Sequence, residues 1–118
     1  MTNKVVEINP PKTGTGARTI LTPKDSLTHQ NCKQVETLFS EAMNQQKTEI
    51  ILDCKAVSFI DSAGLELLVE THKKLRTRGG ILKMIALNEV CRDILVVTRL
   101  ITDFHVYTDI HEAIRHGA

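Results

Sequence analysis

The sequence predicts an α/β sandwich, formed by a single domain over residues 1–118. Three observations lead to this fold class. A chain of 118 residues is long enough for one domain with its own hydrophobic core, and too short for two. Short runs rich in β-branched residues alternate with segments whose apolar residues recur at helical spacing. The expected order is β-β-α-β-α-β-α-β-α, and this alternation favours parallel pairs of strands.

The first half of the chain is expected to hold two short strands, a helix and a longer strand. The short strands are expected at Lys4–Ile8 and Ala17–Leu21, joined by a loop rich in Pro and Gly. Helical spacing of apolar residues predicts an amphipathic helix over Thr28–Gln45. Apolar runs between Glu49 and Ile60 predict a buried strand with a bend near Asp53–Lys55.

The next helix and strand are marked by their flanking residues. Apolar residues from Leu65 to Leu75 recur at helical spacing. Cations precede Gly79-Gly80, which is typical of a helix C-terminus. A third buried strand is then expected over Ile81–Leu87.

The end of the chain predicts two more helices and a short strand between them. Asn88 is expected to cap a helix that carries the apolar residues Val90, Ile94, Val97 and Ile101. An edge strand is expected at Val106-Tyr107. Asp109 and Glu112 resemble a capping pair for a last helix at Glu112–His116.

Composition and charge restrict the expected partners and the compartment. The formal net charge is +1 and aromatic residues make up 3% of the chain, which argues against binding of nucleic acid or of a membrane surface. No signal peptide is expected, and no apolar run approaches the ~20 residues of a membrane span. Cys32, Cys54 and Cys91 are odd in number and widely spaced, which predicts buried thiols in a reducing cytoplasm.

The junction Asp61-Ser62-Ala63-Gly64 is the main candidate for a functional site. It joins an expected strand to an expected helix, whose N-terminus leaves backbone N–H groups unpaired and carries partial positive charge. Asp61 or Ser62 can cap these groups, and Gly64 permits a close approach by a ligand or another backbone. Ser62 is therefore expected to be an exposed hydroxyl on a surface that suits negative charge. Spacing alone is also consistent with a purely structural role, in which both residues only cap the helix.

The patterns of common enzymes do not fit the sequence. A nucleophile elbow requires Gly two residues before Ser62, where Ile60 stands. His111 and His116 resemble a zinc-binding pair on a helix, but five residues separate them, so the side chains point ~140° apart. No metal and no cofactor are expected, and a small α/β enzyme is the weakest of the functional hypotheses.

The junction also carries a resemblance to a known family. The run Val57-Ser58-Phe59-Ile60-Asp61-Ser62-Ala63-Gly64-Leu65, followed by Leu68, resembles the signature of the STAS domain, the fold of bacterial anti-sigma factor antagonists. Similar features follow downstream, at Arg78-Gly79-Gly80, Leu100, Phe104, Val106-Tyr107 and Glu112-Ala113. The resemblance covers nearly the whole chain. It implies a small mixed β-sheet of four to five strands, with about four helices packed mainly on one face.

The same resemblance implies a regulatory binding module without enzymatic activity. In the family, a serine or threonine at the start of the helix after the third strand is phosphorylated by a histidine-kinase-like serine kinase, which is also the anti-sigma factor. The unphosphorylated antagonist binds this kinase and frees the sigma factor, phosphorylation breaks the complex, and a phosphatase resets the switch. Ser62 matches the first of two hydroxyl positions, so it is the expected phosphorylation site.

Ala63 departs from the family pattern, because it occupies the second hydroxyl position, where some members are phosphorylated. A hydroxyl residue followed by Ala-Gly also resembles STAS subunits of lipid ABC transporters, which require no phosphorylation. The alternative function is therefore an accessory subunit docked on a transporter ATPase. For the regulatory function, the expected partner-binding residues are Asp61, Ser62, Ala63, Gly64 and Leu65 at the helix start, with Asp25 and Ser26 in the neighbouring loop.

Overall fold

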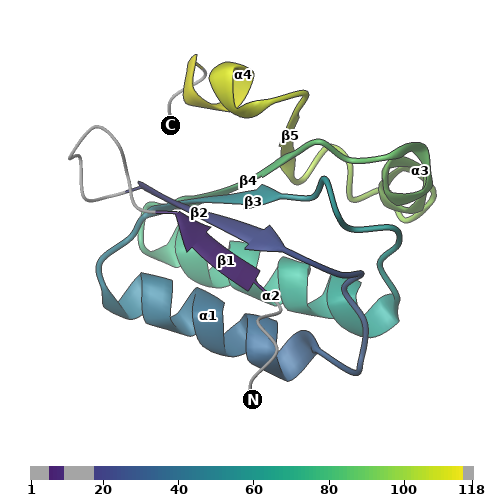
Figure 1. Ribbon diagram of the computed structural model, residues 1–118. Helices are drawn as coiled ribbons and strands as arrows, with labels where there is room; N and C mark the ends of the chain where they lie inside the picture. Colours follow the sequence, from purple (N-terminus) through teal and green to yellow (C-terminus); the bar gives the residue numbers. More distant parts are fainter. Residues whose placement is uncertain (1–5, 10–17, 116–118) are drawn as a thin grey trace.

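The computed structural model describes residues 6–9 and 18–115 and confirms the α/β class. Figure 1 shows one sheet with the strand order β1-β2-β3-β4-β5. β1 pairs antiparallel with β2, and the strands from β2 to β5 run parallel, so the sheet is mixed. The strands are β1 (Val6–Asn9), β2 (Arg18–Pro23), β3 (Glu49–Asp53), β4 (Ile81–Ile85) and β5 (His105–Tyr107). The loop expected between the first two strands lies largely outside the described residues.

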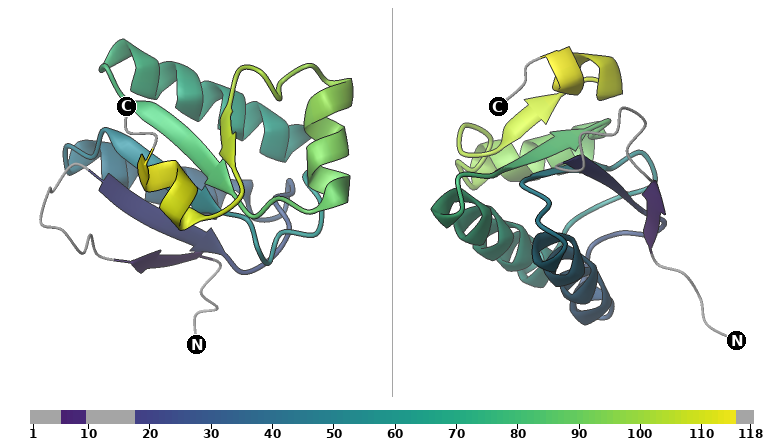
Figure 2. Two further views of the ribbon diagram at one scale, coloured as in Figure 1. Left: turned by 90° about the horizontal axis from the view of Figure 1, so that it is seen from above. Right: turned by 90° about the vertical axis from the view of Figure 1, so that its left-hand side faces the viewer.

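Helices cover both faces of the sheet unequally. They are α1 (Cys32–Asn44), α2 (Ser62–Thr77), α3 (Glu89–Val97) and α4 (Ile110–Arg115). Figure 1 and Figure 2 show α1 and α2 side by side under one face, α4 over the opposite face, and α3 beyond one end of the sheet. The buried residues of α1, α2 and α3 share one core, so most of the helical packing is on one side, as expected.

Strand β3 contributes to a core on each face, because successive residues of a strand point to opposite faces. Ile50 and Leu52 belong to the main core with α1, α2 and α3. Ile51 packs with Ile85 and Ala113 in a smaller core under α4. A strand that is buried on both faces requires a continuous apolar run, which accounts for Ile50-Ile51-Leu52.

A buried lysine in the sheet connects α4 to β4. Lys83 in β4 is fully buried, and its Nζ atom donates a hydrogen bond to the carbonyl oxygen of Ala113 at 2.6 Å. The same Nζ lies 2.7 Å from Oε2 of Glu49, whose Oε1 accepts a hydrogen bond from Nε of Arg18 at 2.9 Å. An unpartnered polar group in this position would be costly, so these partners compensate for the burial of the Lys83 side chain within the sheet.

The predicted start of the first helix is wrong by four residues. α1 begins at Cys32 instead of Thr28, because the intervening residues form a turn. The backbone N–H groups of Asn31 and Cys32 donate to the carbonyl oxygen of Thr28, at 3.1 and 2.9 Å. The Asn31 side chain accepts a hydrogen bond from the Thr28 N–H at 3.0 Å. Side-chain bonds of this kind offer the backbone an alternative to the helix.

The predicted strand over Glu49–Ile60 is also too long, since β3 ends at Asp53. Asp53 accepts a hydrogen bond from the backbone N–H of Lys55 through its side chain at 3.1 Å, and the chain turns there. The apolar run at 57–60 is a loop, of which Ile60 makes one isolated parallel bridge with Leu27. This loop leads directly into α2.

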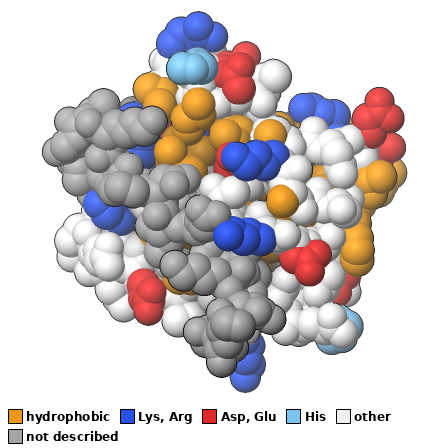
Figure 3. Space-filling view, viewed as in Figure 1, with side chains coloured by type: hydrophobic (Ala, Val, Ile, Leu, Met, Phe, Trp, Pro, Cys, Tyr) orange, Lys and Arg blue, Asp and Glu red, His pale blue; other side chains and the backbone are white. Residues whose placement is uncertain are grey.

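The third helix is shorter than predicted, and two of its expected apolar residues are exposed. α3 ends at Val97 and buries Cys91 and Leu95, whereas Val90 and Val97 are 52% and 77% exposed. The helix start is fixed against the 57–60 loop, because the Asn88 side chain donates to the carbonyl oxygen of Ser58 at 3.1 Å. Asn88 caps the helix as expected. Hydrophobic side chains consequently reach the surface at the right-hand side of Figure 3, where Figure 1 places α3.

The capping pair expected for the last helix is confirmed, although α4 starts at Ile110. The Asp109 side chain accepts a hydrogen bond from the Glu112 N–H at 2.9 Å, and the Glu112 side chain accepts one from the Thr108 N–H at 2.7 Å.

Among the helices of the described ranges, none is long and apolar enough to cross a membrane.

Candidate functional site

The candidate site lies at the start of α2, at the end of the sheet where the parallel strands finish. Asp61 is the N-cap residue, with extended backbone angles, and Ser62 is the first helical residue. Ser62 is exposed, and its hydroxyl makes no hydrogen bond to any residue within 18–115. The predicted location of Ser62 at an exposed helix N-terminus, with Gly64 in the first turn, is therefore confirmed.

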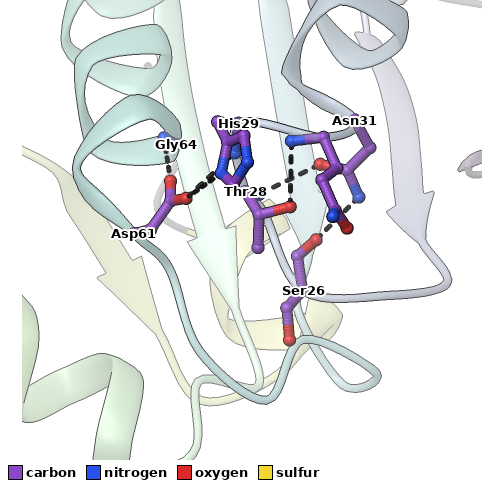
Figure 4. A network of polar contacts seen from close by, with 7 residues as sticks. Ser26, Thr28, His29, Asn31, Asp61 and Gly64 are labelled. Atoms are coloured by element: carbon purple, nitrogen blue, oxygen red, sulfur yellow. Dashed lines mark hydrogen bonds and ion pairs between the residues drawn. The ribbon is translucent and has the colours of Figure 1, made fainter.

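Asp61 connects the helix start to the loop before α1. Its Oδ1 accepts a hydrogen bond from the Gly64 N–H at 2.9 Å, and its Oδ2 accepts one from the His29 N–H at 2.9 Å. The His29 imidazole Nδ1 lies 3.4 Å from the same Oδ2. The hydrogen bond from Gly64, followed by that from His29, holds the pKa of the Asp61 carboxyl below its usual value. Figure 4 shows this network, which keeps Asp61 ionised beside Ser62.

Gly64 is required by the close packing of the two segments. A Cβ atom at Gly64 would stand 2.5 Å from the carbonyl oxygen of Leu27 and 2.9 Å from Cγ2 of Ile60. The same Leu27 carbonyl accepts a hydrogen bond from the Asp61 N–H at 3.0 Å. The glycine therefore lets the loop backbone lie against the first turn of α2.

Asp25 and Ser26 occupy different positions in the neighbouring loop. Asp25 is exposed, and its side chain accepts a hydrogen bond from the Ser26 N–H at 2.7 Å. Ser26 is only 5% exposed; its hydroxyl accepts a hydrogen bond from the Phe59 N–H at 3.2 Å, and its carbonyl accepts one from the Asn31 side chain at 2.7 Å. The Asp25 side chain is thus accessible from solvent, whereas Ser26 holds the loop in place.

The remaining expected residues are less accessible than Ser62. Ala63 and Leu65 are half-buried, Leu65 packs against the main core, and Gly64 is buried. The main role of these residues is to pack the first turn of α2 against the rest of the domain, and little of their side chains is accessible from outside.

Two exposed residues beside the site were not predicted from the sequence. The His29 side chain is 76% exposed and lies against Asp61, which follows it by 32 residues. Phe59, in the loop that leads into α2, is 46% exposed. The neighbourhood of His29 could not be read from the sequence, because it depends on the pairing of Leu27 with Ile60. The exposure of Phe59 could not be predicted either, because Phe59 lies in a segment that was expected to be a buried strand.

The main chemical group that this site presents to solvent is the Ser62 hydroxyl. The described part of the chain holds no group of three His, Cys, Asp or Glu side chains arranged to bind a metal ion. Ser62 combines an accessible hydroxyl with the positive end of a 16-residue helix, and a phosphate on it would lie near unpaired backbone N–H groups.

Comparisons with known proteins agree with the resemblance in the sequence. The STAS domain family model matches residues 9–113. A Thermotoga maritima protein provisionally named an anti-sigma factor antagonist is 30% identical over 95 residues, which cover 80% of this chain and 84% of that protein. The crystal structure of the similarly named TM1081 of Thermotoga maritima superposes with a TM-score of 0.85 at 25% identity, covering 93% and 92% of the two chains.

The fold is also shared with the anti-sigma factor antagonist SpoIIAA. The structure of its unphosphorylated form superposes with a TM-score of 0.70 at 17% identity, covering 93% of this chain and 94% of SpoIIAA. At this identity the similarity establishes the fold alone.

Proposed function

Because the chain belongs to the STAS domain family, we propose that it is an anti-sigma factor antagonist switched by phosphorylation at Ser62. In this function it is a binding module without enzymatic activity. Its partners are a histidine-kinase-like serine kinase, which is also the anti-sigma factor, and a serine phosphatase that restores the unmodified state. The module works in the cytoplasm, where the kinase has access to ATP.

The exposed hydroxyl of Ser62 at the start of α2 is the observation that carries this proposal. The hydroxyl makes no hydrogen bond within residues 18–115, so phosphorylation breaks no existing contact. The helix N-terminus accommodates negative charge, and the phosphorylated domain is therefore expected to stay folded. A modification of this kind alters the surface and preserves the fold.

The effect on binding follows from charge. A phosphate adds about −1.5 to −2 charges and three acceptor oxygens at the surface. Asp61 is adjacent and ionised, so the partner surface that fits this site already faces one carboxylate. A second, larger negative charge opposes binding by like-charge repulsion and by the cost of removing the phosphate from water.

The contact surface is centred on Ser62. Asp61, the N-cap residue, and Ala63, in the first turn of α2, flank it, and Asp25 extends it into the neighbouring loop. The residues packed beneath this surface hold it in position; they are Gly64, Leu65 and Ser26.

The alternative function is an accessory subunit of a lipid ABC transporter. It is favoured by the absence of a second hydroxyl at Ala63.

The proposal is tested by calorimetric titration of the wild type, Ser62→Ala and Ser62→Asp against the cognate serine kinase. Ser62→Ala is expected to bind like the wild type and to become insensitive to ATP, because it cannot accept phosphate. Ser62→Asp is expected to bind about tenfold more weakly, since it adds roughly half the charge of a phosphate.

Ser58→Asp provides the matched control, because Ser58 is also exposed and lies in the loop that precedes α2. This control should bind like the wild type. If Ser62→Asp also binds like the wild type, and ATP transfers no phosphate to the protein, the switch is refuted and the transporter function becomes the better account.

A further inference from the structure

We propose that a shallow groove between α1 and α2 forms a second contact for the protein partner, and that it receives a Lys or Arg side chain flanked by apolar residues. This inference rests on the proposed function, because it concerns the same anti-sigma factor. It adds the chemistry by which that partner is recognised.

The groove lies where the first halves of the two helices run side by side, as Figure 1 shows. Its volume is about 170 Å³. On α2 the lining positions follow the spacing i, i+3, i+4 and i+7, so they form one continuous stripe. The lining residues are Cys32, Lys33 and Glu36 from α1, and Ala63, Glu66, Leu67 and Glu70 from α2.

The floor of the groove is apolar. Cys32 and Ala63 are half-buried, and Leu67 belongs to the main core but remains 8% exposed. Small side chains at Cys32 and Ala63 leave the space that a larger residue would fill. An apolar group of a partner can therefore enter between the helices and remove this surface from water.

The rim of the groove is acidic. Three glutamates and one lysine line it, and within residues 18–115 neither the glutamates nor Lys33 form an ion pair. Glu66 and Glu70 are four residues apart on the same helix, an arrangement of like charges that disfavours the helix. Both lie beyond the first turn of α2, where the helix dipole no longer accounts for acidic residues. The charge pattern therefore matches a cationic side chain from outside the domain.

The groove and the phosphorylation site act on different parts of the partner. Ala63 lines the groove, whereas Ser62 does not. Consecutive helix positions point about 100° apart, so Ser62 faces a neighbouring direction. The groove supplies electrostatic attraction and apolar contact. The phosphorylation state of Ser62 determines whether the surface around Ser62 can pack against the partner.

The test is the affinity of Glu66→Lys and Glu70→Lys for the serine kinase that binds the unphosphorylated wild type. Each reversal is expected to weaken binding about tenfold at low salt, and the loss should shrink at high salt because the interaction is electrostatic. Glu41→Lys is the matched control, since Glu41 is exposed on α1 and lies outside the groove. It should bind within about twofold of the wild type.

Neutral variants keep the test informative if a reversal lowers the stability of the fold. Glu66→Gln and Glu70→Gln should each weaken binding about threefold, with unchanged thermal midpoints. If all four groove variants bind like Glu41→Lys, the groove proposal is overturned. In that case a weakened Ser62→Asp would still support the phosphorylation switch, whereas failure of both sets of variants would overturn the proposed function as well.

Discussion

At the scale of single residues, Asp61 links two segments that are far apart in the sequence. One carboxylate oxygen accepts a hydrogen bond from the first turn of α2, and the other accepts one from the loop before α1. Gly64 lets the same two segments approach, because no side chain stands between its backbone and the Leu27 carbonyl. The shape of the surface around Ser62 therefore depends on Asp61 and on Gly64.

Replacement of Asp61 by Asn should remove a pH-dependent part of the stability. The pKa of the Asp61 carboxyl is lowered from 3.8, mainly by the hydrogen bond from Gly64. Folding thus favours the ionised form, and this contribution is present above the unfolded pKa and is lost as pH falls through the lower folded pKa. The difference in free energy of unfolding between wild type and Asp61→Asn, measured by denaturant titration, should be larger at neutral pH than near pH 3. A difference that stays constant over this range would show that the charge is unimportant.

Replacement of Gly64 by Ala should destabilise the domain by about 2 kcal/mol, because the added Cβ meets backbone that cannot move cheaply. Gly79→Ala is the comparison, since Gly79 has φ +73° but no atom near the added Cβ. That substitution should cost about 1 kcal/mol through backbone strain alone. Denaturation curves of the two variants give the comparison directly, and equal losses would contradict the packing argument.

At the scale of the elements, buried polar side chains join α2 and α4 to the sheet region. His72 on α2 is buried, its ring packs edge-on against Phe104 at 5.5 Å between centroids, and the His105 ring of β5 lies 6.2 Å away. Its Nδ1 atom makes no hydrogen bond within the described ranges. Lys83 plays the corresponding role for α4, through Ala113 and Glu49.

The stability of the domain should fall as pH drops below about 6.5, and His72 should cause part of this loss. Burial, followed by the charges of Arg76 and His105, lowers the pKa of His72 from 6.5, while Asp103 opposes the shift. Between the lowered folded pKa and 6.5 the unfolded chain binds more protons, so acidification favours unfolding. Denaturant titrations from pH 7.5 to 5 should show a shallower pH dependence for His72→Gln than for the wild type. If the free energies of unfolding of the two proteins vary with pH in parallel, His72 does not contribute to the pH dependence.

Truncation of Lys83 to Ala should lower the free energy of unfolding by about 3 kcal/mol, because it leaves a cavity and removes the cation facing Glu49. Lys83→Met fills most of the space and should cost less. In Lys83→Ala, amide hydrogen exchange should be accelerated relative to the wild type, and the acceleration should be larger in α4 than in α1. Uniform acceleration over both helices would argue against a specific role of Lys83 in holding α4.

At the scale of the whole molecule, the sequence predicted the element order and the position of Ser62, since both follow from periodicity and local capping. Element limits were less predictable. Asn31 and Asp53 redirect the backbone through side-chain hydrogen bonds, so α1 starts late and β3 ends early. Which residues of α3 are buried does not follow from its sequence alone, because the contact of Asn88 with the 57–60 loop sets the orientation of the helix.

The groove between α1 and α2 was also invisible in the sequence. Glu36 and Glu66 belong to different helices, and only the parallel βαβ arrangement brings them to the same rim. The burial of Lys83 was missed for a related reason, because its partners Glu49 and Ala113 come from two other elements. Local signals describe each element, whereas these features depend on tertiary pairing.

The central claim is most directly tested by measuring the affinity of the cognate kinase for the purified phosphorylated and unphosphorylated protein, with the modified residue mapped by mass spectrometry. The account predicts a single phosphate on Ser62 and a dissociation constant raised by more than about tenfold, with both forms folded. A phosphate on another residue, or equal affinity of the two forms, would contradict it.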